Sequence, residues 1–562
     1  MGFFFTLLAL VVLLGLTWRY LGSYMEAVFD GRVHFFGFVE RPVYRALRTS
    51  PEQEQTWKRY AGAMVVFSAV SLLFTYVILR IQGSLPLNPQ HLGAVGPALS
   101  FNTASSFLTN TNWQNYGGEA TMSYFSQMGA LTVQQFVSPA VGIAAALVLV
   151  RGFSRKNSPT IGNFWVDITR CLFYILLPMA FIAGIIFVGE GAVQTLAGTV
   201  SIKDSLNGVT QTIPRGPIGF MEAIKQLGTN GGGFLNANSA TTFENPTGLT
   251  NFLSIYLLLS IPVALTYTFG KMVGSIKHGF ALLAVIIILF GSWVAFTSAA
   301  EHQNNPAVAA AGIHSTVGNT EGKEVRFGDT STALFGVAST QTSTGSADAS
   351  YDSFTPIGGF GLLTGMMMGE VTPGGTGTGL YTLLLYAILA VFIGGLMIGR
   401  TPEYLGKKIQ AREVKLAGLG ALVMPIAVLV LTALAVSLAA GRVGPLNAGP
   451  HGFTEILYGL TSQGNNNGSA FGGLTGNTPF YNIIGAIDML IGRFGIMIPA
   501  IALGGSLAEK NVVPESLGTF RTDNGMFVGL TIGVILIIGA LTFFPAIALG
   551  PIVEQLSHLR FF

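Results

Sequence analysis

The segment Thr229-Asn230-Gly231-Gly232-Gly233 is a polar, glycine-rich interruption in a chain that is otherwise strongly apolar. Three comparable segments occur elsewhere, and they read Thr109-Asn110-Thr111-Asn112, Ser343-Thr344-Gly345 and Asn465-Asn466-Asn467-Gly468. The four recur roughly every 110 to 125 residues, which indicates an internal repeat because unrelated loops would not share one spacing. Mildly apolar stretches too short to cross a bilayer precede them, for example 220–227 and 453–460.

The composition places the chain in a membrane. Of its 562 residues 50% are hydrophobic and only 10% are charged, with a mean hydropathy of +0.58, whereas soluble domains carry about 25% charged residues. The single cysteine, Cys171, excludes a disulfide framework and a cysteine-based metal site. Ten apolar runs are long enough to span the hydrocarbon layer as helices, at 3–20, 62–81, 131–150, 172–189, 250–269, 279–299, 380–398, 416–438, 484–505 and 526–548.

The apolar runs and the polar segments alternate in a regular order. After the first run, an apolar helix, a segment with one of the polar bursts and a second apolar helix follow one another four times, with one helix left at the end. We therefore expect an all-α polytopic membrane protein with four helix–pore loop–helix repeats and an extra helix near each terminus. The predicted divisions are 1–61 (first helix and cytoplasmic loop), the four repeats 62–170, 171–278, 279–415 and 416–524, and 525–562 (last helix and tail).

The distribution of basic residues predicts the orientation. The loops 23–61, 151–170, 270–278, 399–415 and 506–524 hold 19 of the 29 Lys and Arg. Because basic loops stay on the cytoplasmic side during insertion, we expect a multi-pass protein with both termini external, which means periplasmic if the membrane is a bacterial cytoplasmic (inner) membrane. The external side carries 13 Asp and Glu, leaving aside Glu370, and its negative charge is expected to concentrate cations at an outer mouth.

The polar segments have the chemistry of an ion-selectivity filter. A half-length helix that returns as an extended strand leaves carbonyl groups unpaired at membrane depth, which is tolerated only where they line a cavity. Four such strands around one axis would form a ring of carbonyls that replaces the hydration shell of a potassium ion, and glycine permits the positive φ that the strand needs. The predicted ligands are Asn110, Thr111, Asn112, Thr229, Asn230, Gly231, Gly232, Ser343, Thr344, Gly345, Asn465, Asn466, Asn467 and Gly468. The alternative of four ordinary turns does not explain why the segments lie in register between paired spans.

Several long strings of sequence carry a resemblance to a known family. They are the segments Thr109–Gln114, Gly228–Asn238, Phe243–Thr247, Gly399–Lys408, Gly449–Phe453, Asn465–Phe471 and Gly492–Gly495. In these segments the chain resembles the KdpA family, the potassium-binding membrane subunits of Kdp P-type ATPases, which are themselves similar to the Trk, Ktr and HKT potassium transporters. The resemblance covers essentially the whole chain, and it adds Asn238 to the predicted filter residues.

The resemblance implies a subunit that binds external potassium, selects it and passes it through an intramembrane tunnel to a KdpB-like ATPase subunit. KdpC-like and small KdpF-like subunits are further implied partners. The sequence has neither a Walker A pattern nor the Asp-Lys-Thr-Gly-Thr phosphorylation motif, so we expect no ATP hydrolysis by the chain itself and no cofactor. A stand-alone potassium channel or an ion-coupled transporter would share the filter and stays open as an alternative. A polytopic enzyme would need more ionised groups within the spans.

The third polar segment departs from the pattern of the others because Ser343-Thr344-Gly345 contains no Asn. Whether Thr344 turns its carbonyl or its hydroxyl inward stays open. We treat Asn112, Gly232, Gly345 and Gly468 as equivalent positions, and we expect Gly232→Asp to lower the affinity for potassium or the preference for it over sodium.

Two further features are predicted to lie near the filter. The run from Glu370 to Gly379 contains Pro373 and several glycines, among them Gly375 and Gly377, and it must break the apolar helix around it. We expect this break to lie under the filter as a gate, or else to be a plain external loop. Arg493 interrupts an apolar span, where it is either a charge below the filter or the structural partner of Asp488 or of another helix.

The sequence also allows predictions for polar side chains outside the filter segments. Gln114 is expected to steady the first polar segment or to line the tunnel, and a bulky cation there should weaken potassium binding. His451, like His314, has no second ligand at metal spacing and is expected to be an ordinary loop histidine.

Overall fold

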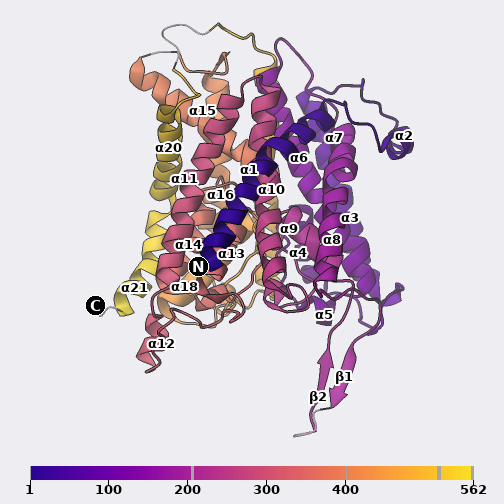
Figure 1. Ribbon diagram of the computed structural model, residues 1–562, viewed down its shortest axis with the longest axis vertical. Coiled ribbons are helices and arrows are strands. Elements are labelled where there is room, and N and C mark those ends of the chain that lie inside the picture. Colours follow the sequence, from indigo (N-terminus) through magenta and orange to yellow (C-terminus); the bar gives the residue numbers. More distant parts are fainter. Residues whose placement is uncertain (1, 204–207, 400, 515–519, 559–562) are drawn as a thin grey trace.

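Ten long helices make up most of the molecule (Figure 1). The structure, a computed structural model, describes residues 2–203, 208–399, 401–514 and 520–558. Within these residues ten helical segments are long and apolar enough to cross a membrane, and each coincides with one predicted span. They are α1 (Gly2–Phe29), α3 (Trp57–Ile81), α6 (Val133–Ser154), the joined α7 (Phe164–Arg170) and α8 (Leu177–Gly189), α10 (Gly248–Met272), α11 (Ile276–Glu301), α15 (Thr378–Ile398), α16 (Ala411–Ser437), α19 (Pro479–Ala508) and α20 (Gly525–Ile547). The prediction of an all-α polytopic membrane protein is confirmed.

Each repeat has, between its two long helices, one short helix that leads into the polar segment, which makes four such helices in all. They are α4 (Pro97–Leu108), α9 (Gly219–Leu227), α13 (Gly328–Gln341) and α18 (Gly449–Gly464), and each ends where a polar segment begins. The order long helix, short helix, long helix therefore occurs four times, as α3–α4–α6, α8–α9–α10, α11–α13–α15 and α16–α18–α19. The helices α1 and α20 are the extra ones, and α1 packs along α10, where Trp18 Nε1 donates to Thr266 Oγ1 at 2.9 Å.

Glycines allow the central helices to approach one another closely. Helix α6 is deeply buried, with 89% of its most apolar window inside the protein. A Cβ at Gly152 of α6 would lie 2.5 Å from the carbonyl oxygen of Gly504 in α19, and a Cβ at Gly22 of α1 would lie 2.7 Å from that of Ala264 in α10. Backbones pack this closely only where no side chain separates them, which is the usual basis of helix association in membranes.

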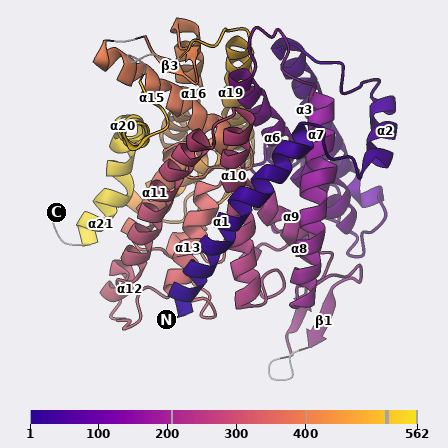
Figure 2. The same cartoon turned by 45° about the horizontal axis from the view of Figure 1, so that its top comes forward.

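Shorter elements complete the structure, most of them at the two ends of the helix bundle. They are α2 (Gly37–Ala46), α5 (Gly118–Thr121), α12 (Pro306–Ala310), α14 (Pro356–Met367), α17 (Ala439–Arg442), α21 (Val553–His558), the hairpin of β1 (Val200–Lys203) with β2 (Thr210–Ile213), and the short pair β3 (Glu403–Tyr404) and β4 (Lys407–Lys408). In Figure 1 the β1–β2 hairpin projects at the lower end, and both chain ends lie in the lower half. Figure 2 shows α2 and β3 at the opposite end from the hairpin. Of the residues in the charge counts, Arg400, Arg560 and Asp204 lie outside the described residues.

His451 lies in a helix and not in a loop, which corrects the expectation from sequence. It is in the first turn of α18, where Nε2 is 3.1 Å from Asp352 Oδ1 and Nδ1 is 2.8 Å from Glu554 Oε1. Asp352 belongs to the third repeat and Glu554 to α21, so the imidazole joins the C-terminal helix to two repeats. The two carboxylates were not recognisable as partners because they are about 100 residues away in the sequence on either side.

This ion-paired histidine predicts a pH-dependent stability. Hydrogen bonds to Asp352 and Glu554 raise the pKa of His451 from 6.5 to about 10. A folded-state pKa above the unfolded value means that the stabilisation is complete below pH 6.5 and is lost as pH rises toward 10. We expect a loss on the order of 2 kcal/mol, measured as a lower midpoint of thermal unfolding of the purified protein at alkaline pH. The variant His451→Gln should unfold at a lower temperature and lose this part of the pH dependence, and an unchanged dependence would contradict the assignment.

Candidate ion-selectivity filter

Four polar segments, here called filter loops 1 to 4, share one backbone conformation. They comprise loop 1 (Thr109–Asn112), loop 2 (Gly228–Gly231), loop 3 (Thr342–Gly345) and loop 4 (Asn465–Gly468). In each loop the second residue has a positive φ, which is 68° at Asn110, 49° at Thr229, 55° at Ser343 and 58° at Asn466. The fourth residue has one too, 50° at Asn112, 72° at Gly231, 87° at Gly345 and 103° at Gly468. The equivalent position in loop 2 is thus Gly231, and not Gly232 as expected from the sequence.

The four loops meet in a closed ring, because each one contacts the next. A Cβ at Gly231 would overlap the carbonyl oxygen of Thr344, a Cβ at Gly345 would overlap that of Asn467, and a Cβ at Gly468 would overlap that of Thr111. Loop 1 carries Asn112 at this position, and there Gly232 provides the space, since a Cβ at Gly232 would lie 2.8 Å from Asn112 Cβ. Glycine is required at these points by the approach of the neighbouring backbone as well as by φ.

Side chains hold the loops to one another at their inner ends. Asn110 Nδ2 donates to the carbonyl oxygens of Gly228 at 3.1 Å and Thr229 at 2.9 Å, which joins loops 1 and 2. Ser343 Oγ donates to the Asn465 carbonyl at 2.9 Å, which joins loops 3 and 4. Asn466 Nδ2 lies 3.0 Å from Thr111 Oγ1 and joins loops 4 and 1. These side chains therefore bridge neighbouring loops.

Loop 3 is built like loop 1 although it lacks an asparagine. The hydroxyls of Thr342 and Thr344 are 2.6 Å apart, and those of Thr109 and Thr111 are 2.7 Å apart. The Thr344 hydroxyl is therefore used within its own loop, while its carbonyl faces Gly231. Among the described residues, no donor reaches the carbonyl oxygens of Thr111, Thr344 and Asn467. A ring of such oxygens has the chemistry to replace water around a potassium ion.

A cavity of about 650 Å³ opens on the outer side of the ring. Asn112, Gly231, Gly345 and Gly468 all line it, whereas Gly232 does not. The residues around it include no Asp, Glu, Lys or Arg, so the immediate mouth is neutral and the acidic residues of the predicted external side stand farther away. A cation that enters meets amide and carbonyl oxygens first.

The break after α14 packs against the inner end of the ring and is not an external loop. Glu370 Oε1 accepts from Asn467 Nδ2 at 2.9 Å, and Glu370 Oε2 accepts from Ser343 Oγ. The Thr376 amide donates to Thr229 Oγ1 at 2.9 Å. The break, residues 368–377, thus contacts loops 2, 3 and 4.

The far end of this break reaches the first repeat. A Cβ at Gly377, where φ is 86°, would overlap the backbone of Gly142 in α6, and a Cβ at Gly375 would lie 2.9 Å from Ser343 Cβ. The two glycines that sequence reasoning singled out are therefore points of backbone contact. The break therefore contacts the filter loops on one side and α6 on the other.

Arg493 lies beside the same break and does not pair with Asp488. Its Nη2 donates to the Ser138 carbonyl at 3.0 Å and lies 3.1 Å from the Cβ position of Gly142, next to the Thr376 carbonyl. No ion pair of Arg493 occurs among the described residues. Asp488 instead lies beside Gly464 at the end of α18. The structure thus removes the pair with Asp488, whereas a structural contact with another helix, α6, is present.

Sequence reasoning missed two residues of α6 that support the filter. Gln135 Nε2 donates to the Gly232 carbonyl at 2.6 Å, and Ser138 Oγ donates to Asn110 Oδ1 at 2.7 Å. Both are polar residues inside an apolar span, and that signal was present in the sequence.

Gln114 connects loop 1 to the segment after loop 2. Its Nε2 donates to the Gly233 carbonyl at 3.0 Å and its Oε1 accepts from the Gly233 amide at 3.0 Å. This paired contact supports the steadying role. We expect Gln114→Arg to break it and to place a cation at the mouth, with a rise of about tenfold or more in the potassium concentration for half-maximal uptake. The variant Gln114→Glu, which introduces the opposite charge, should affect binding less, and equal effects of both would contradict a role for charge.

Four re-entrant loops that meet around one axis, each between two membrane-spanning helices, define a polytopic pore-loop membrane protein. The family model described as "Potassium-transporting ATPase A subunit", KdpA, matches residues 7–556. The chain therefore belongs to the KdpA family.

Individual relatives agree with this assignment. The potassium-transporting ATPase potassium-binding subunit of Mesorhizobium japonicum is 52% identical over 98% of this chain and 97% of its own. The protein of the same description from Methylobacterium nodulans is 53% identical over 96% of this chain and 94% of its own. The crystal structure of the potassium transporter TrkH from Vibrio parahaemolyticus has a similar fold, with a TM-score of 0.51 at 14% identity over 77% of this chain and 83% of that one.

Proposed function

We propose that this chain is the potassium-binding and selectivity-filter subunit of an ATP-driven potassium uptake complex in a bacterial cytoplasmic membrane, with both termini external. The observation that carries the proposal is the closed ring of filter loops, in which unbonded carbonyls of Thr111, Thr344 and Asn467 face the neighbouring loops. Carbonyl oxygens at this density suit a dehydrated potassium ion better than a smaller, more strongly hydrated sodium ion. The names of its relatives support the same ligand.

The break at 368–377 supports a transfer of the ion to a partner and not straight conduction. It contacts three of the filter loops, and the guanidinium of Arg493 lies beside α6 near it, so we propose that it closes the axial path below the ring. An ion that leaves the filter then moves sideways, and we propose an intramembrane tunnel to a KdpB-like ATPase subunit. KdpC-like and small KdpF-like subunits complete the proposed complex. The residues proposed to line the gate or tunnel are Gln114, Glu370, Gly375, Gly377 and Arg493.

The experiment that tests this function is a purification of the chain together with the products of its neighbouring genes. We expect a complex whose ATPase subunit is phosphorylated and whose ATP hydrolysis is stimulated by potassium, and we expect uptake into proteoliposomes only with ATP. Potassium flux through the purified chain alone, without ATP, would instead identify a channel or ion-coupled transporter and overturn the proposal.

A further inference from the structure

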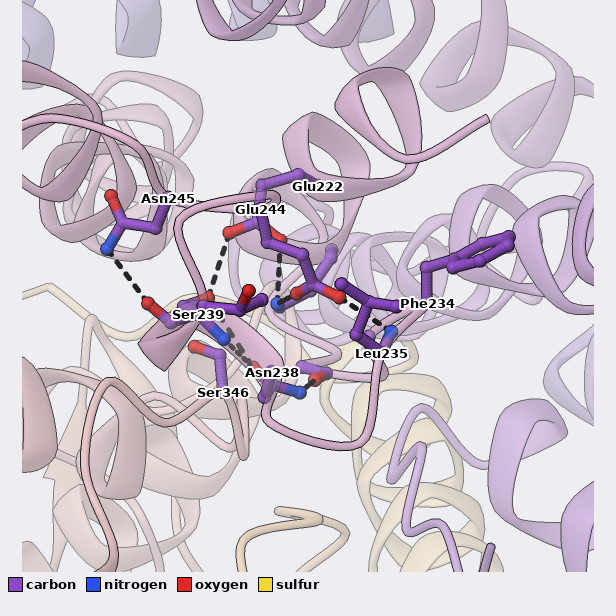
Figure 3. A network of polar contacts seen from close by, with 12 residues as sticks. Glu222, Phe234, Leu235, Asn238, Ser239, Glu244, Asn245 and Ser346 are labelled. Carbon is purple, nitrogen blue, oxygen red and sulfur yellow. Dashed lines mark hydrogen bonds and ion pairs between the residues drawn. The ribbon is translucent and has the colours of Figure 1, made fainter. Parts of the chain in front are cut away.

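A buried charge cluster lies at α9, the helix that leads into filter loop 2, and Figure 3 shows two of its members, Glu222 and Glu244. Lys225 Nζ in α9 is 2.6 Å from Glu222 Oε2 and 2.6 Å from Glu244 Oε2, and none of the three side chains is exposed by more than 1%. Ionised groups are rarely this deeply buried, because removal of each from water costs several kcal/mol, about as much as the pairing returns. Such a cluster is retained where it defines one particular arrangement of the chain around it.

Every carboxylate oxygen of the cluster has a partner. Glu222 Oε1 accepts from Gln226 Nε2 at 2.8 Å and from Ser239 Oγ at 2.9 Å, and Glu244 Oε1 accepts from the Leu235 amide at 2.8 Å. The cluster therefore holds both ends of the segment Leu235–Glu244, which covers loop 2 on its outer side. Burial raises the pKa of Glu244 to about 7, and Lys225 opposes that rise, so the charge of Glu244 depends on contact with this ammonium.

The covered segment carries Asn238, which connects the cluster to the filter. Asn238 Nδ2 donates to the Gly231 carbonyl at 2.9 Å, while its Oδ1 accepts from the amides of Ser239 at 2.9 Å and Ala347 at 3.2 Å. One side chain thus fixes the direction of a filter carbonyl and the position of the segment after loop 3. Figure 3 shows Asn238 with Ser239 and Ser346 around it.

A second connection runs from the cluster to loop 3. Gln226 donates to Glu222 through its amide nitrogen and accepts from Ser346 Oγ through Oε1 at 2.9 Å. Ser346 directly follows Gly345, the positive-φ residue of loop 3. The seam between loops 2 and 3, where Gly231 meets Thr344, is therefore held at two points, by Asn238 and by the bond from Ser346 to Gln226. Both points depend on Glu222, which accepts hydrogen bonds from Gln226 and from Ser239, the neighbour of Asn238.

We propose that Glu222, Lys225 and Glu244 are positioning residues that hold the Gly231 carbonyl and the seam between loops 2 and 3, and that they thereby set how strictly the filter discriminates potassium from sodium. The inference rests on the proposed filter. When Glu244 is ionised, the cluster of one lysine and two carboxylates also places a net negative charge in the wall beside the ion path, which favours a cation. Satisfied buried networks rigidify the structure around them, and selectivity depends on a fixed arrangement of carbonyls.

The test uses Glu244→Gln, which preserves shape and removes the charge, in the complete transport complex. We expect the KM for potassium uptake to rise about tenfold, with sodium becoming a measurable competitor, while the rate at saturating potassium changes by less than about twofold. The matched control is Glu321→Gln, which makes the same change at an exposed glutamate on the predicted external side. This variant should behave as the native protein. Parallel losses in KM and maximal rate, or native selectivity, would overturn the proposal.

A milder variant covers the case in which Glu244→Gln does not assemble. Ser346→Ala removes only the hydrogen bond to Gln226 and leaves the charges in place. We expect a rise of about two- to threefold in the KM for potassium in the same direction, and no shift would overturn the proposal. The experiments distinguish an error in the proposed role of the cluster from an error in the proposed filter. Native uptake by a Gly231 variant would contradict the proposed filter. Impaired uptake by a Gly231 variant, together with native behaviour of Glu244→Gln, would contradict only the proposed role of the cluster.

Discussion

A Gly231→Asp variant is expected to lose high-affinity potassium uptake. At a φ of 72° any side chain is strained, by about 1–2 kcal/mol, and its Cβ would overlap the Thr344 carbonyl oxygen. Loop 2 or loop 3 must then move, and the carbonyl ring opens at this seam. We expect a loss of roughly 3 kcal/mol in binding, which corresponds to about 100-fold in apparent affinity, together with a weaker preference over sodium. The measurement is the concentration dependence of potassium uptake, with sodium as the competitor.

A comparison of alanine variants separates the position in the ring from simple crowding. Gly231→Ala carries the strain of positive φ and the overlap with Thr344, whereas Gly232 has no positive φ and an alanine there would press on Asn112 Cβ at 2.8 Å and the Phe107 ring at 2.9 Å. Gly231→Ala should therefore impair uptake more than Gly232→Ala. Gly248→Ala, where a Cβ has open space, is the control. A larger effect at residue 232 would restore the register expected from the sequence and contradict the one described here.

An Arg493→Met variant is expected to allow cations to leak without ATP. The guanidinium of Arg493 lies beside Ser138 and Gly142, near the break that is proposed to close the axial path. A positive charge there opposes a second cation by a few kcal/mol at the effective dielectric constant of protein sites, and methionine fills much of the same space without the charge. We expect passive potassium flux into proteoliposomes to rise by about 30-fold or more, a change of roughly 2 kcal/mol in the barrier.

Two variants control for loss of structure at this site. Arg493→Lys keeps the charge and should keep the passive flux low. Asp488→Asn changes an acid five residues earlier on α19 that does not contact the guanidinium, and it should not raise the flux. Native passive flux and native uptake in Arg493→Met would show that the side chain serves only the packing of α19 against α6. A high flux in Arg493→Lys would contradict the role of charge.

The number, type and order of the helices could be predicted from the sequence. Each span is an apolar run of about 20 residues, and lipid forces such a run into a helix because no water satisfies its backbone. The filter segments were equally visible, since Asn, Gly and Thr between paired spans have no other explanation when they recur four times. The third segment was recognised by its position, although Ser343 replaces the asparagine.

The register within the filter could not be predicted in the same way. Three glycines in a row at Gly231–Gly233 offer three equivalent candidates, and local sequence does not say which of them takes the positive φ. The choice is made by the neighbouring loop, because only at Gly231 does the Thr344 carbonyl occupy the space of a side chain. Likewise, Glu244, the second partner of Lys225, and both partners of His451 come from other segments of the chain and have no local signal.

What the sequence by itself determined is therefore the class of molecule: hydropathy set the ten spans, and the periodic polar bursts set the four re-entrant loops. Only the tertiary structure decided which backbone oxygens face one another, that the break around Glu370 and Gly377 lies under the ring, and which side chains hold loop 2 from behind. The reason is physical. Transfer into lipid depends on the composition of one segment at a time, whereas the approach of a carbonyl to a glycine 113 residues away, as from Gly231 to Thr344, depends on how the repeats pack together.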